Sequence, residues 1–124
     1  MGYPFVDVEL GDIRRNRTKR VRMLADTGAG FMALPKSLSR ELHIEPVTKI
    51  DATLADGRRE KVDLGFAYVK VLDRETVAQA LILDTPEPLL GSFTLQLLGL
   101  MVDPTREEVK PSRSFGLGLL GSLH

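Results

Sequence analysis

One short segment of the 124-residue chain has the residue types for acid–base chemistry, the triplet Asp26-Thr27-Gly28. The largely apolar residues 21–25 lead directly into Asp26, so we expect a strand to deliver its carboxyl group, rigidly held, to a turn at a cleft. Gly28 allows a tight turn and leaves room for a second carboxyl group. Two carboxyl groups this close share one proton, so that one activates water as a base while the other polarises a carbonyl group.

The chain supplies only one such loop. Asp63-Leu64-Gly65 has the spacing but lacks the hydroxyl residue and the apolar approach strand, and Asp56-Gly57 is typical of a hairpin turn. Two-carboxylate chemistry therefore requires two chains, with Asp26 facing its copy across a two-fold axis. The triplet also has an ordinary interpretation as an Asp-Gly-type turn without chemistry.

Short strand-like segments, separated by Gly, Pro and Asp, make up most of the chain. Alternating or continuous apolar residues predict strands over 3–10, 21–25, 49–54, 59–64, 67–72, 76–83, 101–103 and 107–110. Short helices are expected over 36–42 and 92–98, with Gly99 capping the second. Asp56-Gly57 predicts a type I′ hairpin turn with positive φ at both residues. The pattern indicates an all-β chain that closes or folds over on itself.

The order of these features resembles the retropepsin-like (retroviral-type) aspartic protease family from residue 3 to about residue 104. The hairpin at Asp56-Gly57 follows Asp26 by about thirty residues, and the segment 89–91, leading into the predicted helix, lies about thirty-five further on. In that family a catalytic Asp-Thr-Gly-Ala loop precedes a flap hairpin and an apolar-apolar-Gly segment that packs behind the loop. The resemblance implies a retropepsin-like acid protease fold: a closed, barrel-like half, one lobe per chain.

The resemblance also implies a role for each matched residue. Asp26 is catalytic, Thr27 carries the hydroxyl that locks the dimer, and Gly28 and Ala29 line the cleft floor. The implied flap tip consists of Leu54, Ala55, Asp56, Gly57 and Arg58, and the segment behind the loop of Leu89, Leu90 and Gly91. The implied function is an aspartic endopeptidase, a homodimer in which two Asp26 carboxylates activate water. It would act on a peptide or protein substrate, without a cofactor or a metal.

Three positions depart from the family pattern. Viral enzymes commonly carry an acidic residue after the Ala and an Arg after the later glycine, and these two residues pair. Gly30 and Ser92 stand there in this chain, which is consistent with a cellular relative whose dimer is stabilised differently. Met32 stands where the family often has Ser or Thr.

Two other readings stay open at this stage. A retropepsin-like module could dimerise, or bind an extended peptide under its flap by strand addition, without cutting it. A β-rich structural module could use Asp26-Thr27-Gly28 only as a turn. For a protease, the expected pocket walls are Phe31, Leu54, Ile82 and Leu83, which would favour apolar side chains flanking the scissile bond.

Composition excludes several other kinds of chemistry. Lys plus Arg and Asp plus Glu both total 17, which calls for neither a nucleic acid nor an anionic membrane as partner. The chain has no cysteine, and its two histidines, His43 and His124, lie in no metalloprotease motif. No serine lies in a G-x-S-x-G motif. A basic run, residues 14–22, lacks aromatic residues for stacking and is predicted to be a solvated hairpin loop.

The ends of the chain predict its organisation. The N-terminus lacks the features of a signal peptide, and no apolar run approaches the length of a membrane span, so a cytoplasmic protein is expected. Residues 1–111 are predicted to form the protease-like domain, and 112–124 a tail, flexible or at the dimer interface. The G-x-G-x-x-G pattern at 116–121 ends too near the C-terminus for a nucleotide-binding helix to follow.

Overall fold

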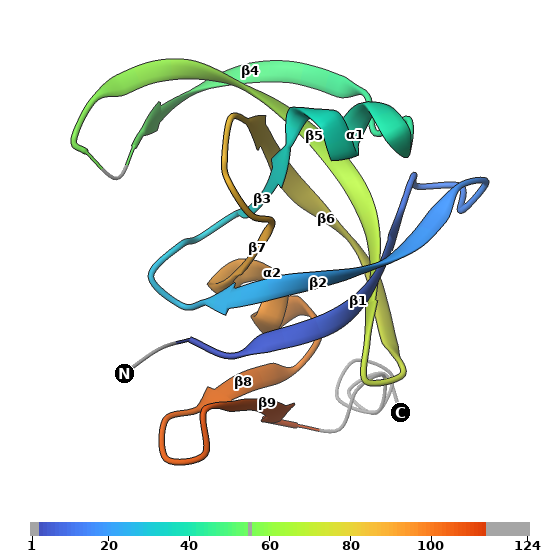
Figure 1. Ribbon diagram of the computed structural model, residues 1–124, viewed down its shortest axis with the longest axis vertical. Helices are drawn as coiled ribbons and strands as arrows, with labels where there is room; N and C mark the ends of the chain where they lie inside the picture. Colours follow the sequence, from blue (N-terminus) through green and yellow to red (C-terminus); the bar gives the residue numbers. More distant parts are fainter. Residues whose placement is uncertain (1–2, 55, 114–124) are drawn as a thin grey trace, which may run out of the picture.

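A computed structural model describes residues 3–54 and 56–113 (Figure 1). The predicted tail from residue 114 on, including the G-x-G-x-x-G pattern, lies outside the described residues. The described part contains nine strands and two short helices. In chain order they are β1 (Phe5–Gly11), β2 (Thr18–Asp26), β3 (Met32–Pro35), α1 (Lys36–Glu41), β4 (Pro46–Thr53), β5 (Arg59–Val71), β6 (Arg74–Leu83), β7 (Leu89–Gly91), α2 (Ser92–Leu97), β8 (Leu100–Asp103) and β9 (Glu108–Pro111).

Strands within the described residues close into a barrel. Neighbours pair in the order β1-β2-β7-β3-β6-β5, and β5 returns to β1, where residues 9–11 pair with 68–70. β4 pairs only with β5, and the two arch over the barrel as an arm, whereas β8 and β9 form a separate hairpin below it (Figure 1). The prediction of an all-β, closed, barrel-like half with short helices is confirmed.

The core lies inside this ring, because alternate residues of each strand point inward. β1 and β2 contribute Val8, Leu10, Met23 and Ala25, all with no exposed surface. The helices close the ends with Leu42, Leu95 and Leu98. This continuous apolar cluster supplies the burial that holds the strand ends in place, including the end of β2. In the described part of the chain, no helix is both long and apolar enough to cross a membrane.

The arm departs from the prediction in two ways. β5 is one continuous strand of 13 residues, where two strands interrupted at residues 65–66 were predicted. Gly65 does not interrupt the strand. It allows the backbone at Glu45 to come close, because a Cβ at residue 65 would lie 2.7 Å from the carbonyl oxygen of Glu45. The prediction of a type I′ turn at Asp56-Gly57 is also wrong, since only Gly57 of the two has a positive φ, +88°. The hydrogen bond from Leu54 N–H to Arg58 O closes a longer loop instead.

The type I′ geometry occurs one hairpin later. Leu72 and Asp73 join β5 to β6, with φ values of 49° and 65°. They follow the last pair of the ladder, Val71 opposite Arg74. Both residues therefore adopt the left-handed region that this turn requires, although Leu72 is a residue type that disfavours it.

The basic run divides between the turn that joins β1 to β2 and β2 itself, where a loop was predicted throughout. Lys19 forms an ion pair with Glu41 at 3.0 Å, and Arg15 lies 3.6 Å from Glu75. The guanidinium of Arg22 lies over the ring of Phe5, 4.8 Å from its centre. These acids and rings partly neutralise or cover the run.

Candidate active site

Asp26 is the last residue of β2, and the turn after it holds its carboxyl group. The backbone N–H of Gly28 donates to Asp26 Oδ1 at 2.9 Å, and the N–H of Ala29 donates to the carbonyl oxygen of Asp26 at 3.2 Å. Within the described residues Oδ2 accepts no hydrogen bond. The side chain is half-buried, whereas Thr27 and Gly28 are exposed. One carboxyl oxygen is thus fixed in place, and the other is available to water or to another carboxyl group.

β7 braces this loop from behind. It pairs in parallel with the end of β2, with Ala25 opposite Leu90 and Asp26 opposite Gly91. The chain then returns to the loop, because Ser92 N–H donates to Ala29 O at 2.8 Å and Phe93 N–H donates to Gly30 O at 3.0 Å. The backbone around Asp26 is therefore bonded on both sides of its turn.

Gly91 makes this close contact possible. A Cβ at residue 91 would lie 2.5 Å from the carbonyl oxygen of Phe31 and would also meet that of Gly30. Both are backbone atoms, so the contact could not be relieved by moving a side chain. Leu90 is buried and Leu89 half-buried, which anchors the segment in the core.

Two further glycines of the loop lie against aromatic side chains. A Cβ at Gly28 would lie 3.2 Å from Asp26 Oδ1 and 3.6 Å from the hydroxyl oxygen of Tyr3. A Cβ at Gly30 would lie 2.9 Å from the ring of Phe93. That ring meets Phe31 edge to face, with ring centres 5.5 Å apart. Sequence reasoning did not predict Tyr3 or Phe93 as site residues, because their positions beside the loop depend on pairing between distant segments.

The arm formed by β4 and β5 ends in the predicted flap tip. Gly57 N–H donates to Leu54 O at 2.9 Å, and Arg58 N–H donates to Asp56 Oδ1 at 3.0 Å. The Arg58 guanidinium donates to Asp56 Oδ2 at 2.6 Å. The backbone N–H and then the side chain of Arg58 lower the pKa of Asp56. Ala55, the fifth predicted flap residue, lies outside the described residues.

A hollow of about 360 Å³ lies between this arm and β6. Leu54, Ile82 and Leu83, three of the four predicted pocket-wall residues, line it. The fourth, Phe31, packs against Phe93 instead. The rest of the lining is largely charged: Lys36, Lys49, Arg58, Glu60, Lys61, Asp63 and Asp84, together with Val62. The walls are therefore less apolar than the sequence predicted.

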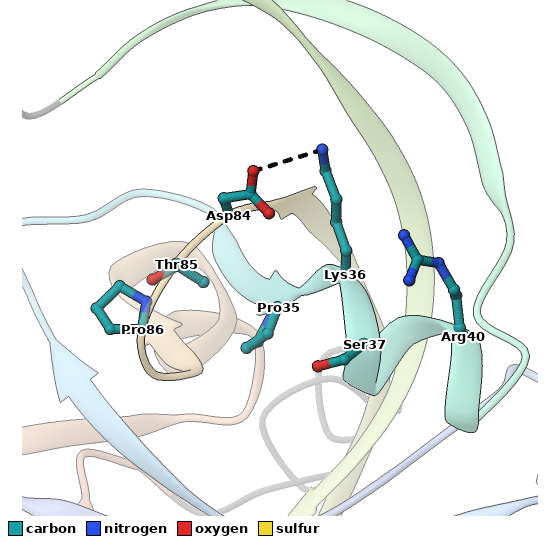
Figure 2. A pocket seen from close by; sticks show the side chains of 7 residues that line it. All are labelled: Pro35, Lys36, Ser37, Arg40, Asp84, Thr85 and Pro86. Atoms are coloured by element: carbon teal, nitrogen blue, oxygen red, sulfur yellow. Dashed lines mark ion pairs between the residues drawn. The ribbon is translucent and has the colours of Figure 1, made fainter.

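A second hollow of about 450 Å³ adjoins the first (Figure 2). Its lining residues come from the end of β3, from α1 and from the loop after β6: Pro35, Lys36, Ser37, Arg40, Asp84, Thr85 and Pro86. Lys36 and Asp84, whose ion pair spans 3.7 Å, line both hollows. Asp26 lines neither of them. Among the described residues no three His, Asp or Glu side chains are grouped as metal ligands.

Comparisons with known proteins agree with this geometry. The chain resembles EIAV protease complexed with the inhibitor HBY-793, with a TM-score of 0.61 and 23% identity over 78% of this chain and 88% of that chain. It also resembles Simian foamy virus (mac) protease in solution, with a TM-score of 0.57 and 17% identity over 77% of this chain and 94% of that chain. At these identities the two matches show the fold. No curated protein matches in sequence.

The sequence itself decides the family. The sequence model described as aspartyl protease matches residues 6–102, most of the chain. The matched range includes the loop at Asp26, the arm and the β7 segment behind the loop in one stretch. The chain belongs to the aspartyl protease family.

Proposed function

We propose that the chain is an aspartic endopeptidase that acts as a homodimer. The observation that carries this proposal is Asp26 itself: a carboxyl group at a strand end, held at one oxygen by Gly28 N–H, on a loop bonded from behind by Ser92 and Phe93. The chain contains this loop once. A site of two carboxyl groups then needs Asp26 from each of two copies, related by a two-fold axis.

In this proposal the two Asp26 side chains divide the work. The ionised carboxylate takes a proton from water, and the resulting oxygen nucleophile adds to the peptide carbonyl carbon. The protonated partner gives its proton to the carbonyl oxygen, so the tetrahedral intermediate carries no net charge. As the C–N bond breaks, the carboxyl group that took the proton from water gives it to the nitrogen, and its ionised partner takes a proton from a hydroxyl of the intermediate. This yields a carboxylic acid and an amine, and leaves one proton on the pair, without a covalent enzyme intermediate.

Other residues support this step. Thr27, exposed beside Asp26, would hydrogen-bond across the two-fold axis and align the two loops. Residues 54–58 would cover the bound peptide, and the hollow beneath the arm would receive its side chains. The apolar wall of Leu54, Ile82 and Leu83 favours an apolar side chain there, and the charged rim favours a polar one further out.

The pair of carboxyl groups also predicts a pH dependence. Because the mechanism needs one proton shared between two Asp26 side chains, activity should fall once both ionise. A rate constant that stays flat from acid to alkaline pH would contradict the shared-proton mechanism.

The test is Asp26→Asn, assayed with a diverse peptide library. Loss of one general acid–base group predicts a fall in cleavage rate of at least about a thousandfold. Dimerisation, followed by analytical ultracentrifugation, should persist. The matched control is Asp51→Asn on β4, whose exposed carboxylate pairs with Lys61 and should be dispensable. Peptide binding by both wild type and Asp26→Asn, with cleavage by neither, would indicate a non-catalytic peptide-binding module. A wild-type chain that stays monomeric even with a peptide inhibitor would rule out the protease.

A further inference from the structure

Two aromatic side chains flank the loop of Asp26, each beside one of its glycines. The hydroxyl oxygen of Tyr3 lies 3.6 Å from the position of a Cβ at Gly28, and the ring of Phe93 lies 2.9 Å from that of a Cβ at Gly30. Both side chains remain about half exposed, Tyr3 at 45% and Phe93 at 52%. Neither therefore belongs to the core of the barrel.

The apolar surface continues along α2. Leu97 follows Phe93 by four residues, so the two side chains lie on the same face of the helix, and Leu97 is 49% exposed. Thr94, Leu95 and Leu98 bury another face of the same segment in the core. A short surface helix needs one apolar face for its own fold. The exposed side chains of Phe93 and Leu97 form a second one, which the described part of the chain leaves uncovered.

This apolar surface lies beside the loop of Asp26, and that position indicates which molecule covers it. α2 begins at the loop, because Ser92 N–H and Phe93 N–H donate to Ala29 and Gly30. The proposed function requires the two Asp26 carboxyl groups to lie within hydrogen-bonding distance of each other. Exposed groups that adjoin the loop must then come close to the second copy. We infer that Tyr3, Phe93 and Leu97, here called the aromatic rim, form the contact with a second copy of this chain; this inference rests on the proposed homodimer.

The rim also accounts for the missing acidic residue at position 30. An acidic side chain at position 30 would have to occupy the space taken by the Phe93 ring. Gly30 and Phe93 therefore depend on each other, because the glycine leaves space for the ring. An apolar contact thus lies beside the loop, where viral enzymes have an ion pair. Apolar contacts are not weakened by added salt, whereas exposed ion pairs are screened by it. The dimer should therefore be insensitive to NaCl.

The absence of cysteine from the sequence makes a direct test possible, because Leu97→Cys carries the only thiol. We expect this thiol to react freely in dilute monomer and at least about tenfold more slowly in the dimer. The control is Ile13→Cys, which is 56% exposed in the turn that joins β1 to β2. That turn lies beyond the far end of the nine-residue β2, on the order of 25 Å from Asp26, so its thiol should react equally at all concentrations.

The concentration dependence separates the possible outcomes. Protection of Leu97→Cys in samples that ultracentrifugation shows to be monomeric would mean that the chain itself covers the rim, and would overturn the inference. Free reaction at every concentration in a sample that ultracentrifugation shows to be dimeric would place the interface elsewhere. That result would overturn the inference and leave the proposed protease intact. A protein that never dimerises would overturn both.

Phe93→Ala supplies a second measurement. Its dimer dissociation constant should rise at least about tenfold, while Phe66→Ala, a phenylalanine 38% exposed on β5, should leave it unchanged. The wild-type dissociation constant should change less than about twofold between about 0.1 M and about 1 M NaCl. A steep rise with salt would show that ion pairs hold the dimer and would overturn the inference.

Discussion

The loop of Asp26 and the predicted flap tip contain the same local motif in different surroundings. In each, an aspartate carboxyl oxygen accepts the N–H of the residue two positions on: Gly28 donates to Asp26 at 2.9 Å, and Arg58 donates to Asp56 at 3.0 Å. Behind the first, β7 and α2 are bonded to the turn. A Cβ at Gly57, in the second, would meet nothing within 4 Å. A turn in which an aspartate side chain accepts the N–H two residues on is therefore a local property, and its rigidity comes from what lies behind it.

The second oxygen of each carboxyl group shows the same contrast. Asp56 Oδ2 accepts from the Arg58 guanidinium at 2.6 Å, which leaves a stable ion pair at the surface. Asp26 Oδ2 accepts no hydrogen bond from residues 3–54 and 56–113. A rigid carboxyl group with one free oxygen suits proton transfer, because its position is set before the reaction begins. A locally stabilised tip on a projecting arm suits a movable cover.

Gly91→Ala should have the largest effect on stability, because it disturbs the packing of β7 against the loop of Asp26. Gly91 has an ordinary φ of −81°, so alanine is acceptable to its backbone. Its Cβ would nevertheless lie 2.5 Å from the Phe31 carbonyl oxygen. Separation of β7 from the loop should reduce the free energy of unfolding by at least about 3 kcal/mol, measured by urea denaturation. A loss below about 1 kcal/mol would mean that the loop is not rigidly backed.

Gly57→Ala makes the same chemical change at the flap tip and should cost less. Space is available there, so the cost is only that of holding an alanine at a φ of +88°, about 1 kcal/mol. Urea denaturation should show this smaller loss. In a peptide assay KM should change more than kcat, because the proposed function has the tip cover the peptide while Asp26 keeps its position. Equal losses from Gly57→Ala and Gly91→Ala would break the contrast between the two regions.

The contrast also explains what the sequence could predict. Asp26-Thr27-Gly28, the arm and the helix after Gly91 follow from local patterns, and the predicted fold was correct. β3 and β7 were not predicted as strands, because segments of four and three residues are too short to show a periodic pattern. The contacts of Tyr3 and Phe93 with the loop join segments far apart in the sequence, so no local pattern contains them. The type I′ turn predicted at Asp56-Gly57 was wrong because the register of β4 with β5 sets the loop length, and the loop length selects the turn type.

Leu72→Asn tests a third tight turn, the type I′ turn between β5 and β6. Leu72 is 51% exposed and has a φ of 49°. Its left-handed backbone is therefore unfavourable, and its side chain gains little packing energy to offset that cost. Asparagine adopts this region more readily, and the substitution should raise the free energy of unfolding by about 0.5 to 1 kcal/mol in urea denaturation. Leu72→Ala is the control, since it shortens the side chain without that conformational benefit. Destabilisation by Leu72→Asn would show that the leucine side chain has a packing role.

Protonation of Asp56 should have the smallest effect, confined to the flap tip. The N–H and guanidinium of Arg58 lower the pKa of Asp56 from its ordinary value of 3.8. A lowered pKa means that these bonds stabilise the tip fully above that value and are lost as the pH falls through the lowered pKa. The NMR signal of the Arg58 amide should therefore move only in strong acid, and in Asp56→Asn this acid-dependent shift should vanish. A shift of that amide near neutral pH would contradict the assignment. Because Asp56 is already ionised above its lowered pKa, a fall in activity toward alkaline pH would not originate at the flap tip.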